Sequence, residues 1–336
     1  MIQFLRAVLT GVTTAVIWVR AVLLARSTLG ASFAQRLWAL RHGFTPDEYV
    51  LFGLRHNNPR DYISWGRTVR LRELNAPFGQ ILNDVVVCHE AMSHRLPTRQ
   101  VFGCLGPGGA IISHGDELVD GPDGIFSLLE RHDAVLKWGQ EGVLQMLDDR
   151  PAWLLQHRDD GLLLNRQPAS REQIAGLLRG LDGYCLLEQV EPHPYLRQWG
   201  ASSASEIEVV VVCEPKPEVV WAGQRIGFAA PGSERVQWTA SIDLGTGSLG
   251  VGRSTRRLGD EPAVAGVVVP GWAGIKRSVE AVAATMPYLR LITFRVVPLP
   301  DGFVLTGACA FADTTTIQLW GGLASSSLGR LLGAGS

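Results

Sequence analysis

The order of apolar runs and turn signals divides the chain into a helical first part and a mixed second part. Residues 1–43 and 60–95 are predicted to be helical, with breaks at Gly30, Gly43 and the segment 75–77. From about residue 124, short apolar runs alternate with capped helical stretches, which is typical of strands and helices in turn. This pattern predicts an α+β protein.

The most informative strand signal lies at residues 291–309. Two apolar runs, 292–297 and 303–307, flank a Pro-Leu-Pro-Asp-Gly segment that predicts a tight hairpin. Alternate side chains of paired strands share one face, so such a hairpin can hold an active site. Here those positions are mostly apolar or small, with one charged residue, Arg295, and no carboxylate except Asp301 in the turn.

Two helix starts carry strong local signals. Thr45 is a predicted cap, followed by Pro46 and two acids near the positive end of the helix dipole. Ser170 with Gln173 has the spacing of a capping box. Beyond the hairpin, we predict strands at 133–138, 142–146, 153–155, 161–164, 184–190, 206–213, 218–228 and 236–244, and helices at 124–131, 170–178 and 273–285. The strands 206–213 and 218–228 are predicted to pair in antiparallel fashion.

The first 46 residues contain five arginines and no acid. Their uncharged run at 7–19 is too short for a spanning helix, which needs about 20 apolar residues. The core of a signal peptide is one interpretation, although only a weak cleavage signal follows. We expect a helix that packs on the body of the protein, and peripheral membrane contact through residues 1–46 is the alternative. The tail from residue 321 is rich in small residues and is predicted to be loosely ordered.

Composition sets further bounds. A chain of 336 residues, 46% hydrophobic and 19% charged, is long enough for about two globular domains. A net charge of -1 offers no attraction to nucleic acid, which we exclude as a partner. The five cysteines stand far apart, which argues against a disulfide framework or a zinc ribbon and favours reduced thiols in a cytoplasmic protein.

Six short patterns occur in an order that resembles the sugar-transfer-associated branch of the ATP-grasp superfamily, which is related to α-L-glutamate ligases. They are Asp47-Glu48-Tyr49, Leu82-Asn83-Asp84, Val135-Leu136-Lys137 with Gly139 and Gly142, Leu187-Glu188 with His193-Pro194, Ile242-Asp243 with Thr246-Gly247, and Val269-Pro270-Gly271-Trp272. The hairpin at 291–309 then falls where the family has its last catalytic strands. The resemblance covers roughly residues 44–320.

The resemblance implies an ATP-grasp-like fold with two α+β lobes and a helical N-terminal leader. The expected parts are a leader and N-terminal region at 1–95, a small lobe at 96–186, a C-terminal lobe at 187–323 and a tail at 324–336. The family's chemistry activates a carboxylate as an acyl phosphate, which an amine or similar nucleophile then captures. It uses ATP and Mg²⁺, and Mg²⁺ is normally held by carboxylates and phosphates.

About half of the family's nucleotide-binding positions are kept. By the resemblance, Lys137 faces the phosphates, and Gly139 and Gly142 belong to a loop that folds over them. Glu188 and Val190 match the segment between the lobes that grips adenine and ribose, and His193 matches a family histidine. A solvated lysine at a strand end, an ordinary turn and a structural histidine are the alternative interpretations of these residues.

The chemical positions of the family are largely replaced. The first phosphate lysine falls on Val85, and an arginine falls on Glu208. The metal-binding aspartate, glutamate and asparagine fall on Arg295, Gly307 and Cys309. An arginine in a magnesium position adds a fixed positive charge besides removing a ligand. The resemblance therefore allows ATP as a cofactor and puts Mg²⁺ in doubt. We predict no metal ligands, and the sequence does not identify catalytic residues.

Two functional hypotheses follow. The first is a pseudoenzyme or repurposed non-ligase, acting in a sugar-polymer or natural-product pathway on a small-molecule or sugar-linked substrate or with a pathway protein. The second is a divergent ATP-dependent carboxylate–amine ligase. It would use Lys137, Glu188 and displaced acids such as Asp301, Asp313 or Glu208.

Overall fold

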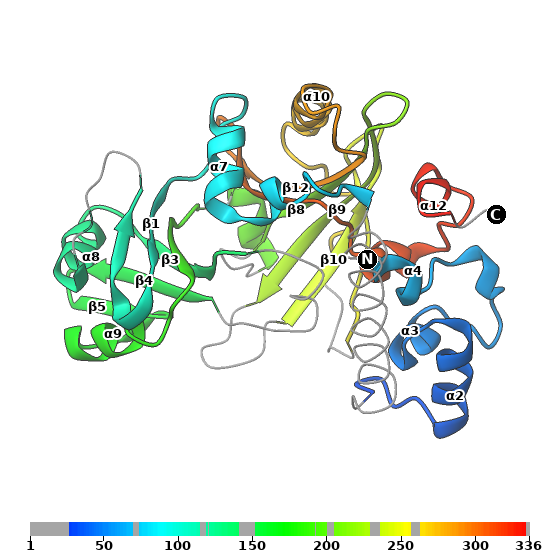
Figure 1. Ribbon diagram of the computed structural model, residues 1–336, viewed down its shortest axis with the longest axis horizontal. Coiled ribbons are helices and arrows are strands. Elements are labelled where there is room, and N and C mark those ends of the chain that lie inside the picture. The colour runs from blue at the N-terminus through cyan, green and yellow to red at the C-terminus, as the bar shows by residue number, and fades with distance from the viewer. Residues whose placement is uncertain are drawn as a thin grey trace, which may run out of the picture.

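The computed structural model describes residues 27–69, 74–114, 119, 121–140, 152–191, 193–199, 205–228, 236–256 and 263–333. Two antiparallel sheets lie side by side, each with helices against it, and further helices from the N-terminal part lie beyond the larger sheet (Figure 1). The predicted α+β class with two lobes is confirmed. Gly142, the predicted strand at 142–146 and residues 1–26 of the leader lie outside the described residues.

The smaller lobe is built on a seven-stranded antiparallel sheet in the order β2-β1-β7-β3-β4-β5-β6. Helices α8 and α9 bury their apolar sides against it, with Ile125 and Ile174 in a core around Phe102, Leu136 and Leu155. The strands are β1 Val101–Leu105, β2 Ile111–Ser113, β3 Ala134–Trp138, β4 Trp153–Arg158, β5 Gly161–Leu164, β6 Gln167–Pro168 and β7 Tyr184–Glu188, and the helices are α8 Gly121–Leu129 and α9 Arg171–Leu178.

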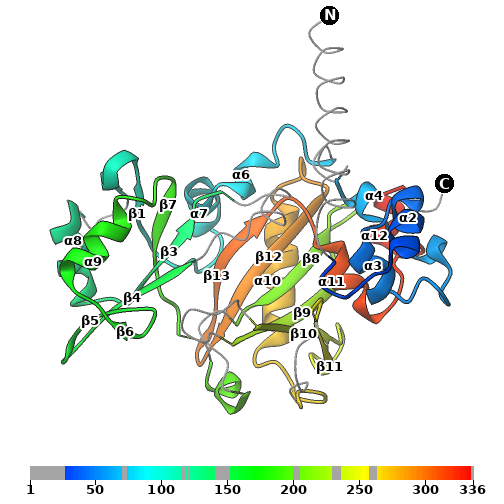
Figure 2. The same ribbon diagram turned by 90° about the horizontal axis from the view of Figure 1, so that it is seen from below.

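The larger lobe is built on a six-stranded antiparallel sheet in the order β11-β10-β9-β8-β12-β13. Helix α10, Trp272–Ala284, runs along one face of it (Figure 2). Its Ile275 and Val279 pack in one core with Val209 and Val211 of β8. The strands are β8 Ile207–Val212, β9 Glu218–Phe228, β10 Val236–Ile242, β11 Leu249–Arg253, β12 Leu291–Leu299 and β13 Gly302–Cys309.

The opposite face of the larger sheet is partly covered by elements from both ends of the chain. Val210 and Val212 of β8 point to this side and pack with Trp65, Ile317 and Leu328. Both faces of β8 are therefore buried, which explains its continuous valine run. The covering elements are α2 Phe33–His42, α3 Pro46–Leu51, η2 Pro59–Asp61, α4 Trp65–Val69, α11 Thr314–Ile317, η6 Gln318–Trp320 and α12 Ser327–Leu331.

The prediction of a loosely ordered tail is wrong for the residues up to 333. Ser326 caps α12 by accepting a hydrogen bond from the Gly329 amide at 3.0 Å. Leu328 is 1% exposed in the core shared with Trp65. A single buried leucine fixes this small-residue stretch, because it gives the short helix an apolar side to bury.

The predicted local signals are confirmed. Capping boxes are present at Thr45 with Glu48 and at Ser170 with Gln173. Gly43 ends α2 in the left-handed region, at φ 79°. The hairpin forms with longer strands than predicted, β12 and β13, and the two residues between the paired Leu299 and Gly302 make its turn.

The two lobes are joined by α6 (Gln80–Asn83), α7 (Val85–Ser93) and the segment that follows them. Asp84 caps α7 by accepting from the Val86 and Val87 amides at 3.0 and 3.1 Å. After α7, the chain pairs with β13 of the larger lobe before it enters β1: the Leu305 amide donates to Pro97 at 2.7 Å, and the Arg99 amide donates to Leu305 at 3.0 Å.

Among the described residues, no helix is long and apolar enough to cross a membrane.

Glu48 is a buried carboxyl between the N-terminal helices and the C-terminal α11. It is 1% exposed, and it accepts hydrogen bonds from the Thr45 amide at 2.8 Å and the Thr315 hydroxyl at 3.0 Å. Burial raises its pKa to about 7, because the desolvation of the charge outweighs the hydrogen bonds that favour it. The folded protein therefore holds a proton here that the unfolded chain releases at lower pH.

We expect this group to make the protein less stable as pH rises from about 4.5 to about 7, because the native state binds the proton more tightly than the unfolded state. Glu48→Gln keeps the capping box and removes the titration. Urea unfolding at pH 5 and pH 8 should show the wild type losing up to roughly 3 kcal/mol more than the variant. Glu130→Gln, at an exposed position just after α8, is the control and should keep the wild-type pH dependence. Equal pH profiles for the wild type and Glu48→Gln would contradict the expectation.

Candidate functional site

A pocket of about 350 Å³, including its open mouth, lies between α7, the segment before β1 and strand β13. Its wall is largely apolar, and four polar side chains face it: His89, Thr98, Arg99 and Thr306. Such a mixture is typical of a small-molecule site, in which apolar walls bury the ligand and a few polar groups orient it. The pocket lies at the junction of the two lobes, because α7 and the 97–99 segment connect them.

Two positions for which the resemblance implied catalytic side chains meet in this pocket. Val85, for which it implied a phosphate lysine, and Gly307, for which it implied a metal-binding glutamate, both line it. Gly307 lies directly across the hairpin from Arg295. The third metal position, Cys309, is buried, and its thiol donates to the Phe311 carbonyl at 3.3 Å. The structure therefore places these positions together, with no carboxylate on any of the four.

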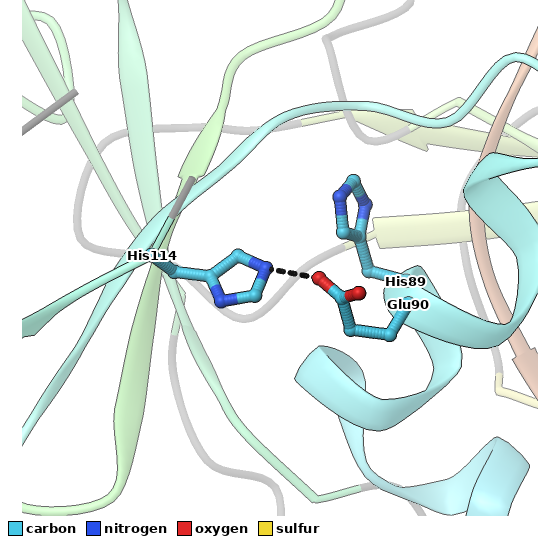
Figure 3. Close-up of side chains that lie close together, drawn as sticks. All are labelled: His89, Glu90 and His114. Atoms are coloured by element: carbon cyan, nitrogen blue, oxygen red, sulfur yellow. Dashed lines mark ion pairs between the residues drawn. The ribbon is translucent and has the colours of Figure 1, made fainter. Parts of the chain in front are cut away.

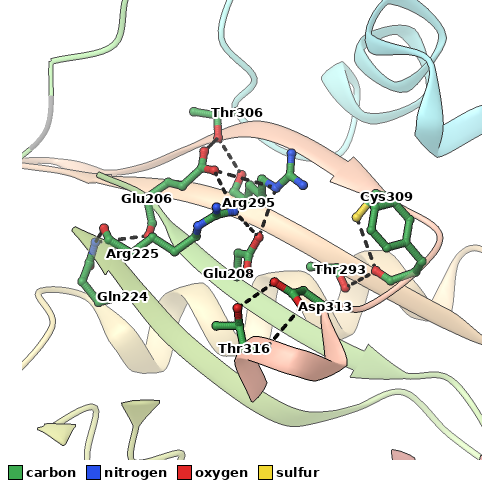
Figure 4. A network of polar contacts seen from close by, with 11 residues as sticks. Glu206, Glu208, Gln224, Arg225, Thr293, Arg295, Thr306, Cys309, Asp313 and Thr316 are labelled. Atoms are coloured by element: carbon green, nitrogen blue, oxygen red, sulfur yellow. Dashed lines mark hydrogen bonds and ion pairs between the residues drawn. The ribbon is translucent and has the colours of Figure 1, made fainter. Parts of the chain in front are cut away.

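A network of charged side chains occupies the sheet face beside the pocket (Figure 4). Glu208 on β8 is the cross-strand partner of Arg295 on β12. Glu208 Oε1 lies 2.6 Å from Arg225 Nη1 and 3.4 Å from Arg295 Nε. Glu206 Oε1 lies 3.7 Å from Arg295 Nε and 3.9 Å from Arg225 Nη1. Two guanidinium groups and two carboxylates therefore balance each other on three neighbouring strands.

Burial makes this balance necessary. Glu208 is 5% exposed, and a buried carboxylate without a partner would be costly. Burial acts to lower the pKa of Arg225, but the carboxylates of Glu208 and Glu206 raise it further than burial lowers it. The guanidinium of Arg225 is thus held in its ionised form by the carboxylates beside it.

This cluster does not fit Mg²⁺. The oxygen ligands that Mg²⁺ needs would come from Glu206 and Glu208, whose carboxylates already pair with Arg225 and Arg295. A divalent cation there would face two fixed positive charges that cannot be removed by deprotonation.

The network reaches the pocket through Thr306. Its hydroxyl lies 3.1 Å from both Glu206 Oε2 and the Arg295 carbonyl, so its single proton can be donated to either acceptor. Because Thr306 also lines the pocket, a ligand there would contact the edge of the ion-pair network.

The displaced acids considered as substitutes have other contacts or lie apart. Asp313 caps α11, accepting from the Thr316 amide at 3.2 Å and the Thr316 hydroxyl at 2.7 Å. Glu208 is held by the two arginines, and Asp301 lies exposed in the hairpin turn. None of these three residues lines the pocket.

Lys137 and Gly139 lie on and just after β3. Lys137 pairs with Cys185 of β7, on the sheet face where Val135 and Cys185 pack against the start of α7. Gly139 bonds on both sides: its amide donates to Gly183 at 2.9 Å, and its carbonyl accepts from Val85 at 2.8 Å. A Cβ there would lie 2.9 Å from the Cys185 sulfur, so the position excludes a side chain. Lys137 thus lies on the sheet face that is turned toward α7, although it does not line the pocket described above.

Glu188, Val190 and His193 lie where the chain passes from the smaller sheet to the larger one. Glu188 Oε2 accepts from the Gln100 amide at 3.0 Å, and the Val190 carbonyl accepts from the Gln189 side chain at 2.7 Å. The His193 amide donates to Pro298 of β12 at 2.9 Å, and its Nδ1 accepts from the Tyr195 amide at 3.1 Å. Of these contacts, the bond from His193 to Pro298 reaches the larger sheet. Nucleotide contacts by these residues stay a prediction.

The sequence-based reasoning missed the partner charges Glu206 and Arg225 and the pocket residues His89 and Arg99. A signal for the first pair was available. Glu206 and Glu208 alternate with apolar residues at the start of β8, and Arg225 stands inside the apolar run of β9. Charges at a period of two within buried strands indicate one charged sheet face.

No family model matches the chain, and no curated protein matches it. The chain is similar to solved structures, among them the ADP complex of purK, an N5-carboxyaminoimidazole ribonucleotide synthetase, with 11% identity over 70% of this chain and a TM-score of 0.41. The D-alanine–D-alanine ligase from Coxiella burnetii gives 12% identity over 80% of this chain and a TM-score of 0.40. A RimK domain ATP-grasp protein from Sphaerobacter thermophilus gives 15% identity over 73% of this chain and a TM-score of 0.36.

The chain spans 46% of the purK structure, 64% of the Coxiella ligase and 69% of the Sphaerobacter protein. These are distant likenesses.

We predict that Glu208→Ala destabilises the protein by about 3 kcal/mol, near the lower end of the range for a buried pair, because it leaves two partly buried arginines with one carboxylate between them. Arg290 and Glu214 provide the matched control. They form an ion pair at 2.7 Å with side chains 43% and 52% exposed. Glu214→Ala should cost at most about 1 kcal/mol. The measurement is urea unfolding at pH 7, and equal losses in the two variants would show that the buried network is not needed for stability.

Proposed function

We propose that this chain is an ATP-grasp-like protein in which a neutral ion-pair cluster replaces the metal-dependent ligase centre. It acts as a pseudoenzyme or repurposed non-ligase, as a binding partner or scaffold in a sugar-polymer or natural-product pathway. The observation that carries the proposal is the pairing of Glu208 with Arg295 and Arg225 beside the pocket.

The two central positions have exchanged their charges relative to the family pattern. The resemblance implies an arginine at position 208 and a metal-binding carboxylate at position 295, and this chain has Glu208 and Arg295. Because the two residues are cross-strand partners, the exchange keeps the attraction between β8 and β12. It supports the view that the sheet was retained while its metal chemistry was lost.

The electrostatic repulsion between the arginines and a divalent ion supports the proposed loss of Mg²⁺. At 4 Å and an effective dielectric constant of 20, one guanidinium repels a divalent ion by roughly 8 kcal/mol. The neighbouring carboxylates would offset this only if they left Arg225 and Arg295. Releasing those arginines within a partly buried cluster would itself be unfavourable.

Lys137 favours the alternative, a divergent ATP-dependent ligase that forms an acyl phosphate. It lies on the sheet face turned toward α7, where the resemblance implies a phosphate-facing lysine. A lysine can hold a nucleotide phosphate with or without ligase activity. Nucleotide binding and metal dependence must therefore be measured separately.

We expect Mg²⁺ to leave ATP affinity unchanged, since the carboxylates that could hold the ion are already paired. Calorimetric titrations with ATP, in excess EDTA and in excess Mg²⁺, test this. Similar dissociation constants are the expected result. A tenfold or greater gain with Mg²⁺, about 1.4 kcal/mol, together with ADP release in the presence of acids and amines, would favour the ligase.

If ATP binds, Lys137→Ala should weaken it by about tenfold, because the variant removes a point charge from the phosphates. Lys276→Ala is a matched control, since Lys276 lies on α10 and its ammonium group bonds the Leu244 carbonyl at 3.4 Å. Circular dichroism should show both variants folded. Unchanged ATP affinity in Lys137→Ala would show that Lys137 does not hold the phosphates.

A further inference from the structure

A second cluster of chemically active side chains lies at the other end of the pocket wall (Figure 3). His89 and Glu90 are neighbours on α7, and His114 directly follows β2. Strand β2 pairs with β1 in antiparallel fashion, so the chain runs back toward the start of β1, which follows α7. The His114 amide continues this pairing by donating to the Phe102 carbonyl at 3.0 Å. The backbone positions of all three residues are therefore set by regular secondary structure.

The three side chains converge on one point. Their nitrogen and oxygen ligand atoms all lie within 4.8 Å of one another. Glu90 Oε1 lies 2.8 Å from His114 Nε2, and the rings of His89 and His114 stand edge to face with centroids 5.6 Å apart. Glu90 is 58% exposed, so its carboxylate can rotate toward both rings.

A simple ion pair explains only two of the three residues. Among the described residues, His89 Nδ1 is buried without a hydrogen-bond partner. A buried ring nitrogen without a partner is available to a metal ion.

We propose that His89, Glu90 and His114 form a binding site for a divalent transition-metal ion, with Zn²⁺ as the ion that fits best. Two imidazole nitrogens and one carboxylate oxygen are a usual Zn²⁺ ligand set, whereas Mg²⁺ prefers oxygen ligands. Zn²⁺ binds such atoms at about 2.0 to 2.2 Å, so small side-chain rotations around the present arrangement complete the geometry.

Three protein ligands leave one tetrahedral position for water or a ligand group. Because His89 also lines the pocket, that position gives an anionic ligand group access to the ion from the pocket side. This site uses no residue of the ion-pair network and stands or falls independently of the proposed function.

The first experiment is a Zn²⁺ titration of the full chain after chelator treatment and dialysis, against a chromophoric chelator, with elemental analysis for stoichiometry. We expect one Zn²⁺ per chain. His89→Ala and His114→Ala should each weaken binding by at least about tenfold. His94→Ala, an exposed histidine just after α7, should bind as the wild type does.

The second experiment protects against variants that fail to fold. Glu90→Gln changes an exposed carboxylate to an amide of the same shape, so it should keep the wild-type circular dichroism spectrum while weakening Zn²⁺ binding about tenfold. Co²⁺ replaces Zn²⁺ as a visible probe, and its absorption bands should change between the wild type and Glu90→Gln. No stoichiometric site in the wild type, or equal affinities in His94→Ala and the His89, Glu90 and His114 variants, would overturn the proposal.

Discussion

Charge neutrality within the larger sheet is the constraint on which the centre of this protein depends. Glu208 lies on β8 between Arg225 on β9 and Arg295 on β12, at a point where the other face of the sheet is sealed by α10. A buried charge without its partner is destabilising, so these three strands must keep their register to keep the charges together. The same register directs Val209 and Val211 of β8 into the core under α10, and Val210 and Val212 into the core on the opposite face.

This arrangement makes the sheet electrostatically complete by itself. The protein neutralises this face with its own side chains, two carboxylates against two guanidinium groups. The pocket beside it has a largely apolar wall, and the hydroxyl of Thr306 connects that wall to the charged network.

The sequence predicted most of the fold because its signals are local. Caps at Thr45 and Ser170, the turn near Asp301 and the apolar runs each specify an element within a few residues. What could not be predicted are contacts between distant segments. The pairing of Arg225 with Glu208, the approach of His114 to Glu90 and the burial of Leu328 each depend on how the sheets and helices assemble. The replaced residues at 295 and 307 were visible in the sequence, but their compensation by neighbouring charges was not.

The segment between α7 and β1 has a mechanical consequence. Residues 97–99 pair with β13 of the larger lobe, and the chain continues directly into β1, which lies beside the edge strand β2 of the smaller sheet. At its other end, α7 is tied to the strand-end residue Gly139 of the smaller sheet through the Val85 amide. One short run of chain is therefore hydrogen-bonded to the larger sheet and is covalently continuous with the smaller one. Any movement of the lobes that separated residues 97–99 from β13 would break main-chain pairing at the wall of the pocket.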